Sequence, residues 1–157
     1  MLAETIAKAY IAAPLFDGSV AHHWQALKRD TLHLFRIIQN KLDVSFVTGQ
    51  PYATAQEMTR KATETGTLLI STDFASHPIF SIDETCQFRA VHDYCHIMAR
   101  RNFGLVGEIK TFHTQALLVS SEALPALFTE IVGQTCVHHV SHAFPVQKIA
   151  RLRITKI

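Results

Sequence analysis

The sequence predicts a mainly α-helical, single-domain bundle with a small two-stranded β element at about residues 42–48 and 67–72. Three observations support this prediction. Apolar residues recur with a helical period in several segments, helix-capping boxes open two of them, and only two short stretches resemble strands. The length of 157 residues fits one domain. We therefore expect a single helical domain over residues 1–157.

The first predicted elements are two helices. Residues 2–13 form a short helix that Pro14 ends, and a turn follows in which Ser19 can cap the second helix. The second helix should run to Asn40. Its apolar residues follow a period close to 3.6 and include Trp24, Leu27, Phe35 and Ile38.

A strand–helix–strand unit is expected next. Residues 42–48 alternate as a short strand does, and residues 67–72 are a second apolar run. Between them, Thr54 and Glu57 have the spacing of a capping box, and Gly66 is a natural left-handed end of the helix. A helix between two strands permits a parallel crossover, so the two strands should pair.

The C-terminal half predicts further helices. Ser81 and Glu84 form another capping box, which opens a helix from Ile82 to Arg101. A helix beginning at Gly107 should close near Ser120, and a longer one should span residues 122–142. Pro145 is expected to start a short last helix.

Bulk composition excludes several classes of protein. A hydrophobic fraction of 48% argues against disorder, and no apolar run reaches the ~18–20 residues that a membrane-spanning helix needs. The three cysteines lack CxxC spacing, which indicates reduced thiols. Glu4 and Lys8 interrupt the first apolar stretch, where a secretory signal would have an unbroken block. We expect a cytoplasmic protein without membrane association.

Charge gives weak guidance about partners. A net charge of +2 is too small to indicate a nucleic-acid-binding protein. The C-terminal segment nevertheless gathers four cations, Lys148, Arg151, Arg153 and Lys156. A local basic tail is the simpler interpretation, and nucleic acid stays a weakly supported partner. The sequence does not indicate an oligomeric state.

Histidine is over-represented, with ten residues in 157 against a typical share of roughly 2%. Two groups have simple explanations. Charged neighbours surround His22, His23 and His33, which therefore lie on a helix surface or its boundary. The second group lies near the end of a helix, where cations complement its negative pole; it comprises His138, His139 and His142.

The stretch FRAVHDYCHIMARR holds the most informative histidines. His92 and His96 are four residues apart, which places both rings on one helix face with their Cβ atoms ~5–6 Å apart. Two imidazoles so placed can reach one metal ion. The string has the spacing of the zincin motif HExxH, with Asp93 in place of the catalytic glutamate. The alternative is a pair of packed core histidines, with Arg89 and Asp93 forming an ion pair one turn apart.

Two acidic residues could complete the site. Glu130 lies among apolar neighbours, where a carboxylate is costly to bury unless it is paired or bound to metal. Glu108 precedes His113 by five residues, so both reach one ion only if Glu108 lies outside the regular helix. We therefore predict a divalent zinc, iron or manganese ion bound by His92, His96 and one or both glutamates. Asp93 and His113 are the candidate catalytic residues, and a loop with Asp73 and His77 could close over the site.

The segment 51–134 resembles a group of uncharacterised proteins encoded by tailed bacteriophages. The resemblance rests on the motifs Pro51-Tyr52, Ser71-Thr72, His77-Pro78, FRAVHD with His96, Gly107-Glu108, His113 and ALPALFTEIVGQ. It implies a phage origin and no particular activity. A weaker analogy links the dipeptide His92-Asp93 to HD-type phosphohydrolases, with His77 as the upstream histidine and a glutamate replacing their later aspartate.

Two functions follow as hypotheses. An ion with an open position would hydrolyse a phosphoester, an amide or a similar bond of a small-molecule or polymer substrate. The alternative is a non-catalytic phage protein that binds a host or virion partner, with structural histidines.

Overall fold

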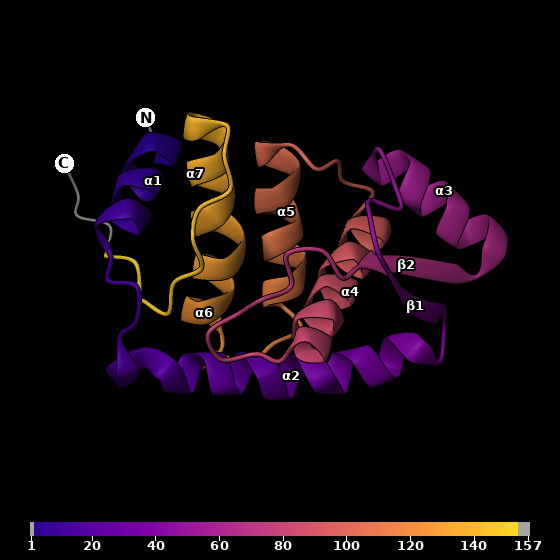
Figure 1. Cartoon of the computed structure of the whole chain (residues 1–157). Coiled ribbons are helices and arrows are strands. Elements are labelled where there is room, and N and C mark those ends of the chain that lie inside the picture. Colours follow the sequence, from indigo (N-terminus) through magenta and orange to yellow (C-terminus); the bar gives the residue numbers. More distant parts are fainter. Residues whose placement is uncertain (1, 154–157) are drawn as a thin grey trace.

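The computed structural model describes residues 2–153 and shows a mainly helical fold with a small parallel sheet, as the sequence predicts. The long helix α2 (Ala21–Gln39) runs along one side of the molecule, and several other helices stand across it (Figure 1). Lys156 of the predicted basic tail lies outside the described residues. The other elements are α1 (Leu2–Ala12), η1 (Gly18–Val20), β1 (Asp43–Val47), α3 (Ala55–Thr65), β2 (Thr67–Ser71), α4 (Ile82–Ala99), α5 (Leu105–Ala116), α6 (Leu124–Phe128), η2 (Thr129–Gly133) and α7 (Gln134–Ser141).

The strand–helix–strand unit has the predicted form. Strands β1 and β2 are parallel, with Asp43 opposite Thr67, and α3 is the crossover between them. The Thr54 side chain accepts a hydrogen bond from the Glu57 amide at 3.1 Å. Gly66 ends α3 with a φ of 70°, a left-handed conformation that glycine adopts without steric cost.

The capping box of α4 is also confirmed. The Ser81 side chain accepts from the Glu84 amide at 3.2 Å, and the Glu84 carboxylate accepts from the Ser81 amide at 2.8 Å. The next helix, α5, begins at Leu105, two residues before the predicted start at Gly107. Gly107 lies inside α5 and makes a close backbone contact, because a Cβ at this position would lie 2.0 Å from the backbone oxygen of Asn102. Its missing side chain lets the turn between α4 and α5 pack tightly on α5.

Three predictions about helix ends are wrong. Ser19 does not cap α2; instead Asp17 accepts from the Ser19 amide at 3.0 Å and caps the short helix η1. The helix predicted over 122–142 is interrupted, because the π-helical turn η2 separates α6 from α7. No helix follows Pro145 within the described residues. Ile149 instead bridges to Phe16, which ties this segment to the start of the chain.

Three groups of buried apolar residues form the core. One lies between α2 and α6 around Trp24 and Leu127, and a second joins α3, β2 and α4 around Met58 and Leu68. The third packs α1 on η2 and α7 around Tyr10. Helix α4 contacts both α2 and α5, so its inward residues are held from two sides. Within residues 2–153, every helix is too short or too polar to cross a lipid bilayer.

Candidate metal centre

Three potential metal ligands converge between α4 and α5: His92, His96 and Glu108. One carboxylate oxygen of Glu108 lies 2.9 Å from His92 Nε2, and the other lies 3.3 Å from His96 Nε2. The two Nε2 atoms are themselves 3.1 Å apart. The i,i+4 spacing on α4 therefore brings the two imidazoles together as predicted, and Glu108 joins them.

Local backbone structure explains how Glu108 reaches the histidines. It lies in the first turn of α5, and its amide donates to Gly104 O at 2.9 Å. The close packing of Gly107 against Asn102 holds this first turn beside the end of α4. A carboxylate at a helix start is also favoured by the positive end of the helix dipole. Glu108 is thus well placed as a ligand while remaining inside the regular helix.

Each histidine has its Nδ1 atom directed at an oxygen acceptor. His92 Nδ1 lies 3.1 Å from Gln115 Oε1. His96 Nδ1 lies 3.1 Å from Thr111 Oγ1 and 3.3 Å from the carbonyl of Arg101, which can only accept. These partners favour the tautomer in which Nδ1 carries the hydrogen. In the neutral form of each ring Nε2 then carries a lone pair, whereas a protonated His92 donates from Nε2 to Glu108.

These three side chains lie close enough together to hold one cation between them. Ligands about 2.0–2.2 Å from a tetrahedral ion lie ~3.3–3.5 Å apart. The two Nε2 atoms are 3.1 Å apart, and they lie 2.9 and 3.3 Å from different oxygens of the Glu108 carboxylate, so the spacing within the group is close to that length. A shared proton can bridge only one pair at a time, whereas a metal ion bridges all three. The donor set of two imidazoles and one carboxylate therefore fits a divalent transition metal.

Burial strengthens the electrostatic coupling within this group. The His96 side chain is fully buried, and those of His92 and Glu108 are 16% and 14% exposed. Burial disfavours charge on both partners, but their mutual hydrogen bond and attraction outweigh it. The pKa of His92 is raised, and the pKa of Glu108 is lowered to about 2. Glu108 is consequently a carboxylate, ready to bind a cation, at any physiological pH.

Asp93 lies beside the centre without belonging to the ligand group. Its half-buried carboxylate has no hydrogen-bond or ion-pair partner among the described residues. Burial raises its pKa to about 6, an effect that the nearby His92 and His96 oppose. The ion pair with Arg89 considered above does not form. Arg89 instead donates to the carbonyl of Ser71, at the end of β2, and to that of Phe74 in the following loop.

The structure does not bring Glu130 together with the other predicted ligands. Its carboxylate accepts hydrogen bonds from Trp24 Nε1 at 2.7 Å, His77 Nε2 at 3.2 Å and Gln134 Nε2 at 2.8 Å. His77 Nδ1 accepts from the amide of Phe80 at 2.9 Å, so its hydrogen lies on Nε2 and points to Glu130. The cost of burying Glu130 is offset by these three donors. This cluster links α2, η2 and the loop before α4.

The other predicted residues also lie apart from the ligand group. His113 is exposed on α5 and packs against Phe112, so it is not positioned as a ligand or base. Asp73 accepts from the amide of Gly49, and His77 is engaged by Glu130, so neither covers the centre. Burial raises the pKa of the adjacent Cys95 to about 12, which keeps this thiol protonated.

Sequence reasoning missed Gln115 and Thr111, which support the two histidines. Both are completely buried, and one donor atom of Gln115, Nε2, has no partner. A signal for them exists in the sequence. Thr111 follows Glu108 at i+3 and Gln115 follows it at i+7, which places all three on one helix face.

Known protein families, curated proteins and solved structures were all compared with this chain, and no match was found.

Proposed function

We propose that this protein binds one divalent metal ion through His92, His96 and Glu108 and uses it to hydrolyse a phosphoester or amide bond. The observation that carries the proposal is the convergence of three potential metal ligands: the two Nε2 atoms are 3.1 Å apart, and they lie 2.9 and 3.3 Å from the two oxygens of the Glu108 carboxylate. Two nitrogens and one oxygen suit zinc, iron or manganese.

The number of ligands supports a catalytic role over a structural one. Structural zinc sites are usually closed by four protein ligands, whereas catalytic sites have three and leave a position for water or substrate. The described residues supply three. An ion with an open position lowers the pKa of bound water and so supplies a hydroxide nucleophile near neutral pH.

Other residues of the chain would orient the two imidazoles and accept a proton. Gln115 and the Arg101 carbonyl hold the two imidazoles by their Nδ1 atoms, which fixes the direction of each Nε2 lone pair. Asp93 is a nearby carboxylate with no hydrogen-bond or ion-pair partner among residues 2–153, so it is the candidate proton acceptor. Cys95 is a poor nucleophile here, because it is buried and protonated.

The test is a hydrolysis screen with phosphomonoester, phosphodiester and peptide substrates in the presence of zinc, iron or manganese. We expect metal-dependent turnover that a chelator abolishes. Asp93→Asn should reduce kcat by roughly 100-fold or more, as expected for loss of a general base. Cys95→Ser is the matched control from the same helix and should retain activity.

Two results would reject hydrolysis by this centre. Turnover that survives the chelator but is lost in Cys95→Ser would indicate cysteine chemistry. Metal binding without turnover on any substrate class would favour the alternative, a non-catalytic phage protein that binds a host or virion partner.

A further inference from the structure

Two distant segments of the chain meet at one end of the molecule. The Ile149 amide donates to Leu15 O at 2.9 Å, and the Asp17 amide donates to Ile149 O at 2.7 Å. The Tyr10 hydroxyl donates to Val146 O at 2.9 Å. The segment after α7 therefore runs alongside the end of α1 and the residues that follow it. Figure 1 shows this end, in indigo and yellow, on the opposite side of the molecule from α3 and the sheet.

Large apolar side chains protrude from both segments. Ile11, Leu15 and Phe16 of the first segment are 64%, 62% and 56% exposed. Phe144 and Val146 of the second are 77% and 70% exposed. We call these five residues the apolar strip. Single exposed apolar side chains are ordinary on a protein surface, whereas a gathered group marks an interaction site.

The extended backbone of the second segment holds its apolar side chains outside. Successive residues of an extended chain point to opposite sides. The Gln147 side chain accepts from Gln134 Nε2 of α7 at 2.7 Å, and Ile149 is fully buried. Val146 and Lys148 consequently lie on the outer side. The Lys148 ammonium donates to two carbonyls at the end of α1, which fixes the segment there.

Positive charge borders the apolar strip. Hydrogen bonds from Ser19 lower the pKa of Asp17, and the charge of Arg153 lowers it further. Arg153 therefore lies near the residue that directly follows Phe16. Arg151 is exposed two residues earlier. On α1, the exposed side chain of Lys8 precedes the first residue of the strip by one turn.

The cations of the two segments outnumber their acids. Residues 2–17 and 143–153 together hold four cations and two acids, which leaves a net charge of two positive. The whole chain has the same net charge of +2, so the rest of it is neutral in total. The cations are Lys8, Lys148, Arg151 and Arg153, and the acids are Glu4 and Asp17.

We propose that the apolar strip and these cations attach the protein to the surface of a membrane that contains anionic lipids. At such a surface, apolar side chains enter the boundary between headgroups and acyl chains, and nearby cations attract the anionic headgroups. Both kinds of side chain are exposed here on the same two segments. Protruding side chains also suit a deformable lipid surface, whereas a folded partner would need a matching pocket for each of them.

The strip depends on the fold, which explains why the sequence alone predicts no membrane association. Neither segment is a continuous apolar run, and the surface forms only when the two segments pair through Ile149. Attachment to a membrane surface needs no membrane-spanning helix. The metal centre between α4 and α5 contributes no residue to the strip, so the inference goes beyond the proposed function.

Co-sedimentation with lipid vesicles at physiological salt tests the proposal. One set of vesicles is phosphatidylcholine alone, and the other mixes phosphatidylcholine with anionic phosphatidylglycerol. We expect the wild type to bind the mixed vesicles and to stay in the supernatant with phosphatidylcholine alone, because attachment needs both apolar and electrostatic contributions. Raising the salt concentration should weaken the binding.

The apolar contribution is tested with a matched pair of double variants. Leu15→Ser/Val146→Ser should lower the vesicle partition coefficient at least ~10-fold, since two apolar side chains no longer enter the lipid. Val106→Ser/Leu117→Ser makes the same changes at exposed positions of α5 and should alter the coefficient less than about twofold.

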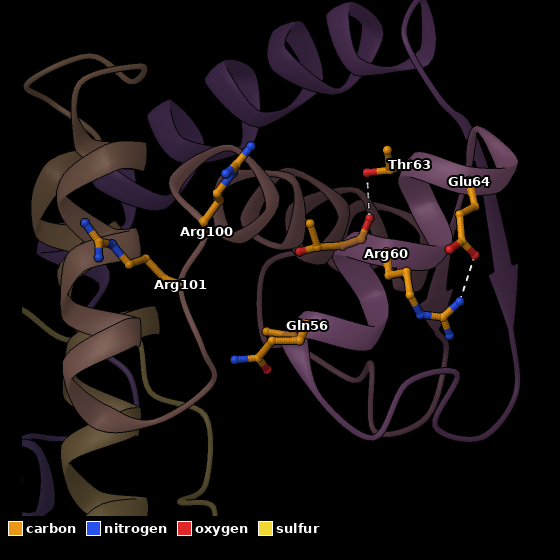
Figure 2. A pocket seen from close by; sticks show the side chains of 8 residues that line it. Gln56, Arg60, Thr63, Glu64, Arg100 and Arg101 are labelled. Atoms are coloured by element: carbon orange, nitrogen blue, oxygen red, sulfur yellow. Dashed lines mark hydrogen bonds and ion pairs between the residues drawn. The ribbon is translucent and has the colours of Figure 1, made fainter.

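The electrostatic contribution is tested in the same way. Arg151→Gln/Arg153→Gln should lower the partition coefficient at least ~10-fold, because each cation near an anionic surface strengthens binding. Arg36→Gln/Arg100→Gln removes the same charge from exposed positions elsewhere and should alter it less than about twofold. Arg36 lies on α2, and Figure 2 shows Arg100 on the turn after α4, beside α3.

Three results would overturn the proposal. The first is no binding to the mixed vesicles, or equal binding to both kinds of vesicle. The second is equal loss of binding in a double variant and its control. The third is a dimer, detected by analytical ultracentrifugation, that Leu15→Ser/Val146→Ser abolishes in a protein that does not bind vesicles, which would assign the strip to a second copy of the chain. Thermal melts confirm that every variant is folded.

Discussion

Replacing Gln115 with leucine should weaken metal binding without unfolding the protein. Gln115 is completely buried, and its Oε1 atom lies 3.1 Å from His92 Nδ1. Leucine has a similar volume and no acceptor, so His92 loses the contact that fixes its ligating tautomer. Losing such a partner typically costs 10–100-fold in metal affinity, or about 1.4–2.8 kcal/mol.

The stability of the metal-free protein should change much less. The substitution leaves His92 Nδ1 unpaired, which costs roughly 1–3 kcal/mol, but it also removes Gln115 Nε2, a buried donor with no partner. The two contributions have similar size and opposite sign. We expect the free energy of unfolding to change by about 1 kcal/mol or less, equivalent to ~2–4 °C in Tm.

Competition with a chromogenic chelator at pH 7 measures zinc affinity, and circular dichroism measures the melting of the metal-free protein. Gln115→Glu keeps an acceptor oxygen and should bind zinc at least as tightly as Gln115→Leu does. Gln25→Leu, on the exposed face of α2, should change neither the zinc affinity nor the melting temperature. Unchanged zinc affinity in Gln115→Leu would refute the assigned role of Gln115. A drop in affinity matched by a large drop in Tm would show that the residue serves packing alone.

Three other substitutions or treatments probe the surroundings of the centre. Glu130→Gln should destabilise the protein by about 2–4 kcal/mol, because an amide cannot accept from three N–H donors as a buried carboxylate does. The zinc affinity of this variant should stay within about twofold of wild type. A thermal melt showing no loss of stability would contradict the prediction. Gly107→Ala should lower the free energy of unfolding by about 1–3 kcal/mol and weaken zinc binding. The added Cβ would displace Asn102 and with it the turn whose Arg101 carbonyl contacts His96. Wild-type zinc affinity in the chelator assay would count against the role of this turn. Cys95 should resist alkylation by iodoacetamide at pH 8 until denaturant is added, because burial raises its pKa to about 12; rapid labelling of the folded protein would show that the thiol is accessible.

Local sequence signals predicted most of the fold. The two capping boxes and Gly66 are short-range features whose hydrogen bonds form within a few residues, so they can be identified without tertiary information. The π-helical turn η2 could not be found in this way. Its backbone conformation accompanies the hydrogen bonding of Glu130 to Trp24 and His77, which are distant in sequence.

The candidate site was predicted only in part, because only some of its contacts follow from local sequence spacing. His92 and His96 share one helix face, so their pairing follows from spacing alone. A buried carboxylate such as Glu130, in contrast, is compatible with either a metal or with N–H donors, and only tertiary structure distinguishes these partners. The resemblance to phage proteins stays a prediction.

Metal content and affinity measured on protein purified without a histidine tag test the central claim most directly. We expect about one equivalent of a divalent ion per chain by elemental analysis after reconstitution. His92→Ala, His96→Ala and Glu108→Gln should each lose that ion, while a variant with both His22→Ala and His33→Ala on exposed positions of α2 should retain it. A wild-type protein that binds no zinc, iron or manganese, or equal loss of metal in all four variants, would contradict the proposed metal centre.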